Sequence, residues 1–236
     1  MSHASQHKTT AVQVPIGADV LQGDLRCPAD PCGIVLFAHG SGSSRHSPRN
    51  QFVARALEQR GLATLLMDLL TPGEEAVDRR TAHLRFDIAL LARRLVTIID
   101  WLRRRDDTAS LPIGLFGAST GAGAALVAAA DRPKSVAAVV SRGGRPDLAG
   151  AALGRVTAPT LLIVGGRDTE VIDMNRRAMT HMRGDVAVEI VPGATHLFEE
   201  SGTLELVAEI AGEFFHRRLR SRLPLSSRPV GSPVQT

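Results

Sequence analysis

Aromatic residues and lysines are scarce in this sequence. Seven Phe and one Trp are the only aromatics among 236 residues, Tyr is absent, and Lys8 and Lys134 are the only lysines. So little aromatic surface argues against nucleic-acid binding, in which bases stack on aromatic side chains. Neither lysine lies in a G-x-x-x-x-G-K-[ST] pattern, so the sequence also lacks a P-loop for nucleotide phosphates.

Cysteines and uninterrupted apolar runs are scarce as well. Cys27 and Cys32 are the only cysteines, and neither has the neighbours that a zinc site needs. They flank a Pro-Ala-Asp-Pro turn, and two interpretations stay open: free thiols or a disulfide. The uncharged stretch 110–130 is interrupted by proline and glycine, which favours a buried strand, turn and helix over a membrane span. The polar N-terminus resembles no secretory signal, so we expect a cytoplasmic location and no membrane partner.

Positive charge is concentrated at one end of the chain. The formal net charge is +4, but five arginines and no acidic residue follow His216, so the rest carries a net charge of −1. A length of 236 residues with 44% apolar residues fits one α/β domain. We expect a flexible N-terminus over residues 1–10, one domain over 11–220, and a basic, Pro- and Ser-rich disordered tail over 221–236.

Short apolar runs alternate with segments of helical period, the pattern of a mostly parallel sheet covered on both faces. A helix is predicted over 88–102, a second with Asn50 as its cap and Gly61 at its end, a third from about 171 to Gly184, and a last one over 204–214. About 18 residues separate the strand ending near 140 from the one starting near 160, which leaves no room for a cap domain there. The eight predicted strands are 11–16, 20–27, 33–38, 63–67, 113–116, 136–140, 160–164 and 186–191.

The segment Gly117-Ala118-Ser119-Thr120-Gly121 matches G-x-S-x-G. It directly follows a predicted strand and precedes a helix rich in Ala and Gly. This context is typical of a nucleophile elbow, in which a tight turn exposes the serine and flanking glycines avoid clashes. The helix N-terminus behind it favours developing negative charge. Ser119 is therefore the candidate nucleophile.

A serine nucleophile needs a base and an acid that orients it, and behind an elbow these follow in the order acid, then His. His196 lies in a loop after a strand, whereas His181 falls within a helix and His216 begins the basic tail. Asp168 follows the end of another strand, where ligand chemistry collects. Two other acids are weaker candidates, because Asp173 lies one helical turn later and Asp185 lies at the opposite edge of the sheet.

Two further groups of residues complete the candidate site. The loop His39-Gly40-Ser41 stands at the end of an earlier strand, so the backbone N–H groups of Ser41 and Thr120 are the expected oxyanion donors. His39 precedes the nucleophile in the chain and is expected to stabilise this loop. Arg45 and Arg142 are candidates for binding an acidic substrate. A purely structural role, in pairs with Asp or with backbone carbonyls, stays open for both.

Four motifs together, FAHGSGSS, GLFGASTGAGAAL, LLIVGGRDTEV and VPGATHLFEE, resemble the α/β-hydrolase superfamily, and dienelactone hydrolase-like proteins most closely. The resemblance covers residues 10–220. It implies an eight-stranded sheet, a triad of Ser119, Asp168 and His196, and no metal or organic cofactor. Dienelactone hydrolase proper has Cys at the elbow, where this chain has Ser119. Similar domains also occur beside phosphoribosyltransferase domains.

The interpretation that follows is a serine hydrolase of the carboxylesterase type that cleaves small esters through an acyl-enzyme. Lactone, thioester or amide cleavage is the alternative among enzymes. A non-catalytic binding protein that keeps the fold is the alternative from a different class. The expected partner is a small-molecule ester, and the sequence leaves the oligomeric state open.

Overall fold

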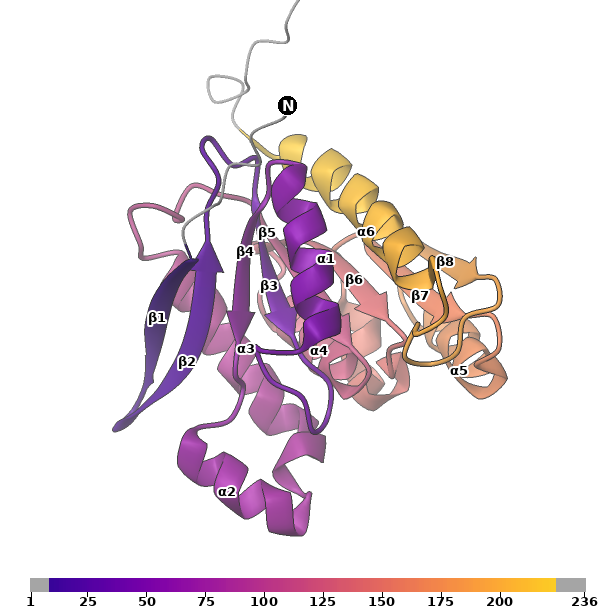
Figure 1. Ribbon diagram of the computed structural model, residues 1–236, viewed down its shortest axis with the longest axis horizontal. Helices are drawn as coiled ribbons and strands as arrows, with labels where there is room; N and C mark the ends of the chain where they lie inside the picture. The colour runs from indigo at the N-terminus through magenta and orange to yellow at the C-terminus, as the bar shows by residue number, and fades with distance from the viewer. Residues whose placement is uncertain (1–8, 224–236) are drawn as a thin grey trace, which may run out of the picture.

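The computed structural model of the protein describes residues 9–223. The expected flexible N-terminus over 1–10 and disordered tail over 221–236 lie outside the described residues except at 9–10, which begin strand β1, and at 221–223. Within them, an eight-stranded sheet forms the centre of the fold (Figure 1). Its order is β1-β2-β4-β3-β5-β6-β7-β8. The strands are β1 (Thr9–Ile16), β2 (Asp19–Arg26), β3 (Ile34–Ala38), β4 (Ala63–Met67), β5 (Ile113–Ala118), β6 (Val136–Arg142), β7 (Thr160–Gly165) and β8 (Val186–Val191).

The sheet is mixed at one edge and parallel elsewhere. β1 pairs antiparallel with β2, and β2 pairs antiparallel with β4. From β4 through β3 to β8, every neighbouring pair is parallel. All eight predicted strands and the α/β-hydrolase architecture are confirmed. The carboxyl ends of the parallel strands meet at one edge, the lower end of the sheet in Figure 1, where catalytic residues of such sheets collect.

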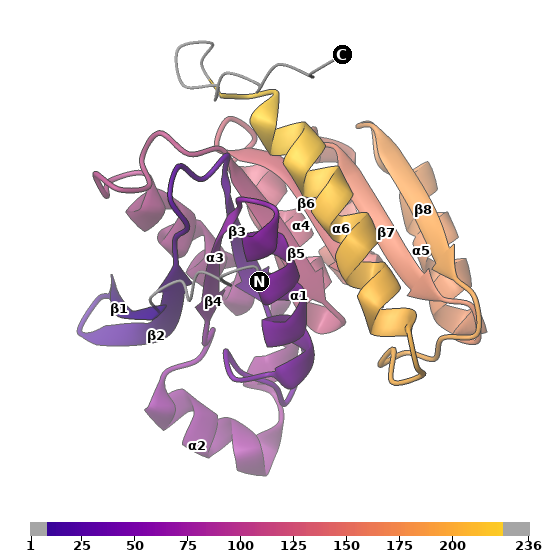
Figure 2. The same cartoon turned by 45° about the horizontal axis from the view of Figure 1, so that its top comes forward.

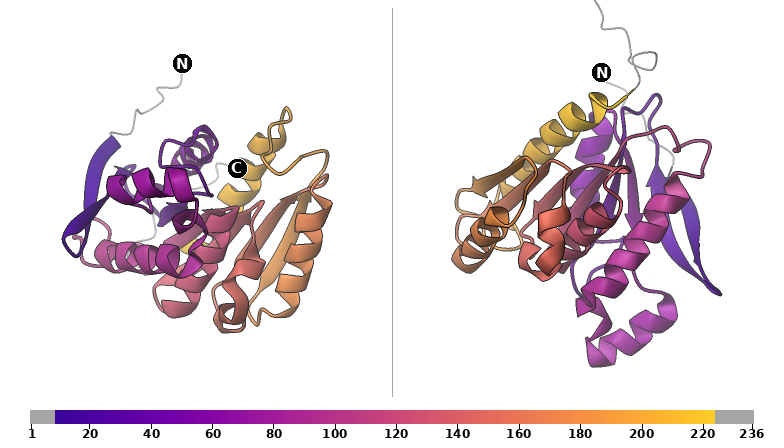
Figure 3. Two further views of the ribbon diagram at one scale, coloured as in Figure 1. Left: turned by 90° about the horizontal axis from the view of Figure 1, so that it is seen from below. Right: turned by 180° about the vertical axis from the view of Figure 1, so that it is seen from behind.

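Helices cover both faces of the sheet. α1 (Pro48–Gln59) and α6 (Thr203–Arg220) lie side by side on one face (Figure 2). α3 (Ile88–Leu102), α4 (Thr120–Asp131) and α5 (Thr169–Thr180) lie on the other (Figure 3). Alternate residues of each strand point to opposite faces, so each strand serves two cores. In β3, Val35 and Phe37 belong to the core under α1 and α6, whereas Ile34 and Leu36 belong to the core under α3 and α4.

The N-cap residue of helix α1 lies three residues before the predicted one. Ser47, not Asn50, is the N-cap residue, because its hydroxyl accepts a hydrogen bond from the Asn50 N–H at 3.4 Å. Pro48 takes the first helical position, where its missing N–H costs nothing. The predicted end is confirmed, since the helix stops before Gly61, whose φ is +76°. At the third predicted helix, α5 stops at Thr180 instead of continuing to Gly184.

One helical segment was not predicted. Helix α2 (Pro72–Thr81) and the 3₁₀ turn η1 (Leu84–Phe86) lie between β4 and α3, beyond the carboxyl ends of the strands (Figure 1). A capping box starts α2: Thr71 Oγ1 accepts the Glu74 N–H at 3.2 Å, and Glu74 accepts the Thr71 N–H at 2.8 Å. Between β6 and β7 the chain forms only the short 3₁₀ segment η2 (Pro146–Arg155), as expected without a cap domain.

Two other features of the described residues bear on the expectations. Both cysteines are free, Cys27 exposed and Cys32 buried, so the disulfide interpretation is wrong. Cys32 Sγ instead lies 3.6 Å from His216 Nδ1. None of the helices within residues 9–223 is both long and apolar enough to cross a bilayer.

Candidate active site

Ser119 stands at the sharp turn between β5 and α4. Its φ of +50° and ψ of −122° place a residue with a side chain in a region that is largely restricted to glycine. The turn is held by three backbone hydrogen bonds. The Ser119 N–H donates to the Arg142 carbonyl at 3.2 Å, and the Ser119 carbonyl accepts from the Ala122 and Arg145 N–H groups, each at 3.1 Å. The neighbouring strand and the first turn of α4 therefore fix the strained backbone.

The glycines around Ser119 are required by close packing. A Cβ on Gly117 would lie 2.4 Å from Ala122 Cα, and a Cβ on Gly121 would lie 2.3 Å from the Ala38 carbonyl oxygen. Both contacts are with backbone, which cannot move away as a flexible side chain could. The G-x-S-x-G pattern thus follows from the way in which β3, β5 and α4 meet.

Three side chains from three separate loops form a hydrogen-bonded chain. His196, in the loop after β8, has its Nδ1 2.6 Å from Asp168 Oδ2 and its Nε2 3.3 Å from Ser119 Oγ. Asp168 follows β7 as the N-cap residue of α5. A carboxylate only accepts, so Nδ1–H donates to Asp168, which leaves Nε2 as the acceptor for the Ser119 hydroxyl. The structure brings together the three residues predicted as nucleophile, base and acid.

The loops that carry Asp168 and His196 are packed directly against each other. The Arg167 N–H donates to the Ala194 carbonyl at 2.9 Å. A Cβ on Gly165 would lie 2.6 Å from the carbonyl oxygens of Ala194 and Thr195. This close approach explains the Gly-Gly pair before Asp168, because only glycine lets the two backbones come so near.

The other candidate bases and acids lie elsewhere. His181 is the C-cap residue of α5, and its Nδ1 is 2.9 Å from the Arg177 carbonyl oxygen. His216 lies on α6, with its Nδ1 3.1 Å from the Arg60 carbonyl oxygen. Asp173 is exposed on α5, and Asp185 pairs with Arg218.

The predicted oxyanion donors flank Ser119. Thr120 is the first residue of α4, and Ser41 lies in an exposed turn after β3. A Cβ on Gly40 would lie 3.2 Å from Ser119 Cβ, so this loop passes beside the nucleophile. Neither the Ser41 nor the Thr120 N–H donates to an acceptor among residues 9–223. Both N–H groups are thus free to bind a substrate oxygen.

Comparison with known proteins identifies the family to which the chain belongs. A family model described as an alpha/beta hydrolase domain matches residues 31–209. The crystal structure of dienelactone hydrolase from Anabaena variabilis is 60% identical, with 91% of this chain and 100% of that chain covered and a TM-score of 0.90. The chain belongs to the α/β-hydrolase family. Its resemblance to dienelactone hydrolase-like proteins is confirmed.

Three further matches differ from this chain in length or in sequence. Proteins named "Putative phosphoribosyl transferase" from two strains of Mycobacterium tuberculosis are 61% identical over 204 residues. The match covers 86% of this chain and 45% of theirs, so the hydrolase spans about half the length of these relatives. Est1E from Butyrivibrio proteoclasticus is 17% identical at a TM-score of 0.73, over 89% of this chain and 98% of that chain, which shows a common fold.

The two candidate substrate-binding arginines of the hydrolase have different surroundings. Arg45 is held by acids: its backbone N–H donates to Asp68 Oδ1 at 2.8 Å, its Nη1 pairs with Asp68 Oδ2, and its Nε lies 3.6 Å from Asp24 Oδ2. These pairs match the structural role that the sequence left open for Arg45. Arg142, the last residue of β6, is buried and pairs with no acid among the described residues.

His39 holds the loop that contains Gly40 and Ser41. Its Nε2 accepts the Leu69 N–H at 3.2 Å, so its Nδ1–H donates to the Gly40 carbonyl at 3.0 Å. Burial lowers the pKa of His39, and both contacts fit the neutral ring, since a protonated ring cannot accept from Leu69. His39 thus ties Gly40 to the end of β4, as expected for a residue that stabilises the loop.

This arrangement predicts how stability changes with pH. Because the pKa of His39 is lowered by folding, the unfolded chain binds more protons below about pH 6.5, and the wild type loses stability as the pH falls through that range. His39→Gln lacks this titration. We expect the difference in unfolding free energy between the two proteins, measured in urea, to narrow from pH 7 towards pH 5. A difference that stays constant or widens would contradict the assignment of a neutral, buried His39.

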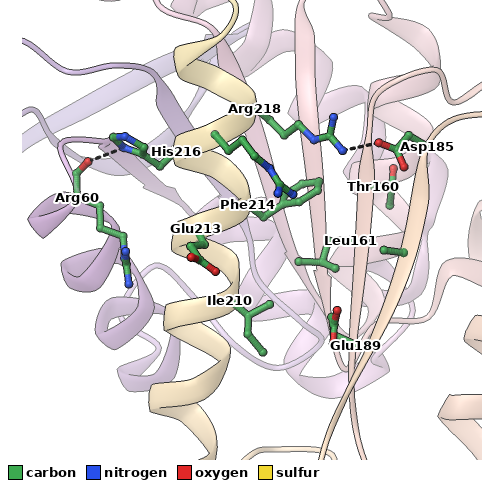
Figure 4. Close-up of a pocket in the computed structure, with 12 residues that line it drawn as sticks. Arg60, Thr160, Leu161, Asp185, Glu189, Ile210, Glu213, Phe214, His216 and Arg218 are labelled. Atoms are coloured by element: carbon green, nitrogen blue, oxygen red, sulfur yellow. Dashed lines mark hydrogen bonds and ion pairs between the residues drawn. The ribbon is translucent and has the colours of Figure 1, made fainter. Parts of the chain in front are cut away.

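A separate groove lies between α6 and the strands β7 and β8 (Figure 4). Its volume is about 600 Å³, and Phe214 and Ile210 of α6 line it together with Leu161 of β7. The Arg218–Asp185 ion pair crosses one end. The residues that line the groove include no serine, and Ser119 is not among them.

Proposed function

We propose that the protein is a serine hydrolase that cleaves small carboxylic esters through an acyl-enzyme. The observation that carries this proposal is the chain of hydrogen bonds from Asp168 through His196 to Ser119, with lengths of 2.6 and 3.3 Å. These lengths support the roles of nucleophile for Ser119, base for His196 and orienting acid for Asp168.

In the first half of the reaction, Ser119 Oγ attacks the ester carbonyl while His196 Nε2 takes the hydroxyl proton. Asp168 keeps the ring oriented and stabilises the imidazolium that forms. The N–H groups of Ser41 and Thr120 bind the oxyanion of the tetrahedral intermediate. As this intermediate collapses, the C–O bond to the alcohol breaks, and the alkoxide takes the proton from Nε2. The product is an acyl ester of Ser119 and a free alcohol.

In the second half, water replaces the alcohol. His196 Nε2 takes a proton from water as the oxygen attacks the acyl carbon, and the same two N–H groups bind the new oxyanion. Collapse breaks the bond to Ser119 Oγ, which recovers its proton from His196. The carboxylic acid leaves, and the enzyme returns to its starting state.

Small esters are the proposed substrate class because the site is open. The His196 side chain retains 37% of its exposed surface although it lies at the centre of the triad, and Ser41 is exposed beside it. The segment between β6 and β7 forms only η2. A long acyl chain would therefore bury little apolar surface, and apolar burial is what favours long chains in other sites.

A series of p-nitrophenyl esters from acetate to dodecanoate tests the proposal. We expect turnover of acetate and butyrate, with kcat/KM at least about 10-fold higher than for dodecanoate, because longer chains gain little binding. Release of p-nitrophenol should begin with a burst as the acyl-enzyme accumulates. Hydrolysis of no ester above the rate in buffer would contradict the proposal.

The same series, with three added substrates, separates the alternatives. A lactone, a thioester and an anilide differ from the esters only in the leaving group, so faster turnover of one of them would reassign the substrate class within the same mechanism. A non-catalytic binding protein would turn over none. A phosphoribosyl transfer activity, suggested by the name of longer relatives, needs a diphosphate site, which the triad does not supply.

A further inference from the structure

Arg142 is a buried guanidinium without a counter-ion. Its side chain is 6% exposed, and its Nε and Nη1 atoms are fully buried without a hydrogen-bond partner among the described residues. Burial, together with the nearby charge of Arg49, lowers the pKa of Arg142 to about 10, so it remains charged at neutral pH. An unpaired buried cation is costly for a folded protein.

The surroundings of Arg142 add positive charge. Arg49 lies in the first turn of α1, which contains no acidic residue, so the positive end of the helix dipole faces the same region. Arg49 Nε is also buried without a partner. Its Nη1 donates to Glu199 at 3.1 Å, but Glu199 is 63% exposed. The positive charges of two guanidiniums and a helix N-terminus thus lie near one another, and one exposed carboxylate is the only negative charge described beside them.

This cluster directly adjoins the triad. Arg142 of β6 is the register partner of Ala118, the residue before Ser119. The Arg142 guanidinium lies 5.7 Å from the centre of the Phe198 ring, two residues after His196. Phe198 is 1% exposed with a φ of +56°, so the His196 loop is bent to bury this ring against the arginine. No local sequence pattern indicates this role for Phe198.

We propose that Arg142 binds an anionic oxygen group, a carboxylate or a phosphate, carried by the ester substrate. Arg49 and the α1 N-terminus add favourable charge beside it. The bound anion supplies the missing counter-ion beside the guanidinium, and charge-assisted hydrogen bonds to a guanidinium are strong in a buried setting. This inference names the substrate class of the proposed esterase site and rests on that proposed function for its kinetic part.

Paired substrates test the kinetic part. The pairs are 4-acetoxybenzoate with its neutral methyl ester, and monomethyl succinate with dimethyl succinate; 4-acetoxyphenyl phosphate serves as the phosphate arm. We expect the wild type to prefer the anionic member, and Arg142→Met to lower the anionic-to-neutral ratio of kcat/KM by about 10- to 100-fold. A ratio cancels any general loss of catalytic competence. Arg142→Lys, which keeps the charge, should give an intermediate ratio and replaces the Met variant if that variant does not fold.

A matched control removes the same positive charge at a position outside the site. Arg155 at the end of η2 pairs with Asp131 at 3.0 Å, and its side chain is 58% exposed. Arg155→Met should leave the preference ratio as in the wild type. Equal ratios in the wild type and Arg142→Met would overturn the proposal, as would the same drop in Arg155→Met.

A binding measurement separates this inference from the proposed esterase function. Sodium succinate or inorganic phosphate, compared with sodium chloride at equal ionic strength, should raise the Tm of Ser119→Ala but not that of Ser119→Ala/Arg142→Met. A shift with succinate alone identifies a carboxylate site, and a shift with phosphate alone identifies a phosphate site. No shift, or the same shift in both proteins, would overturn the anion site even if the enzyme hydrolyses esters. A shift limited to Ser119→Ala would uphold it even if no ester is cleaved.

Discussion

Ser119→Ala should lower ester turnover by about 10⁴-fold or more while leaving the fold intact. The Ser119 hydroxyl is the elbow group that lies 3.3 Å from His196 Nε2, and a triad acts as one unit. The remaining activity would come from the oxyanion donors Ser41 and Thr120. The folded state should be kept, or slightly stabilised, because alanine is smaller and the strained backbone at φ +50° is held by its neighbours.

A second serine provides the control for this substitution. Ser110 is exposed before β5, outside the site. Ser110→Ala should retain wild-type kcat and KM for p-nitrophenyl acetate. Purified, folded Ser119→Ala that kept more than about a tenth of the wild-type rate would show that Ser119 is not the nucleophile. Removal of a triad nucleophile costs far more than tenfold in rate.

Asp168→Asn should lower kcat by about 10³- to 10⁴-fold. Asp168 accepts a hydrogen bond from His196 Nδ1 at 2.6 Å, which leaves Nε2 free to accept from Ser119. An asparagine amide can instead donate to Nδ1, and the ring proton then moves to Nε2, where it blocks proton transfer from Ser119. The geometry would survive, but the base would be in the wrong tautomer. Steady-state hydrolysis of p-nitrophenyl acetate gives the measurement.

Asp173 provides the control for the acid. It lies on α5, one turn after Asp168, and is exposed. Asp173→Asn makes the same chemical change without touching His196, so we expect kcat within about twofold of the wild type, as for most surface substitutions. A large loss of kcat in Asp173→Asn together with a small loss in Asp168→Asn would show that Asp168 is not the orienting acid.

The sheet and the elbow were predictable because local pattern determines them. Each buried strand is a short apolar run between Gly or Pro, and G-x-S-x-G between a strand and a helix has few other interpretations. Asp168 and His196 followed from the rule that catalytic groups stand at the carboxyl ends of parallel strands. These inferences need only the order of elements along the chain.

The starts of helices α2 and α1 are marked by local capping signals and not by the apolar pattern. Helix α2 is short and mostly polar on its surface, so it has no apolar stripe, yet the Thr71–Glu74 capping box marks its start. Ser47 before Pro48 is a better N-terminal signal than Asn50, because proline favours the first helical position. Local chemistry could have corrected both.

The roles of the arginines could not be predicted from the sequence. Arg45 meets Asp24 of β2 and Asp68 after β4, residues that adjoin only because β2 and β4 pair in the sheet. Arg142 lacks such a partner because β6 ends beneath Phe198 and beside α1. Distinguishing a paired arginine from a free one requires the tertiary packing of segments that are far apart in the sequence.

Labelling with a fluorophosphonate probe shows whether Ser119 is an activated nucleophile, because this reagent phosphonylates serines that a neighbouring base activates. The full chain is incubated with the probe, digested, and the modified residue located by mass spectrometry. We expect stoichiometric modification of Ser119 in the wild type, slow labelling of His196→Ala, and no labelling of Ser119→Ala. An unlabelled wild type, or equal labelling of wild type and Ser119→Ala, would contradict the role of Ser119 as nucleophile.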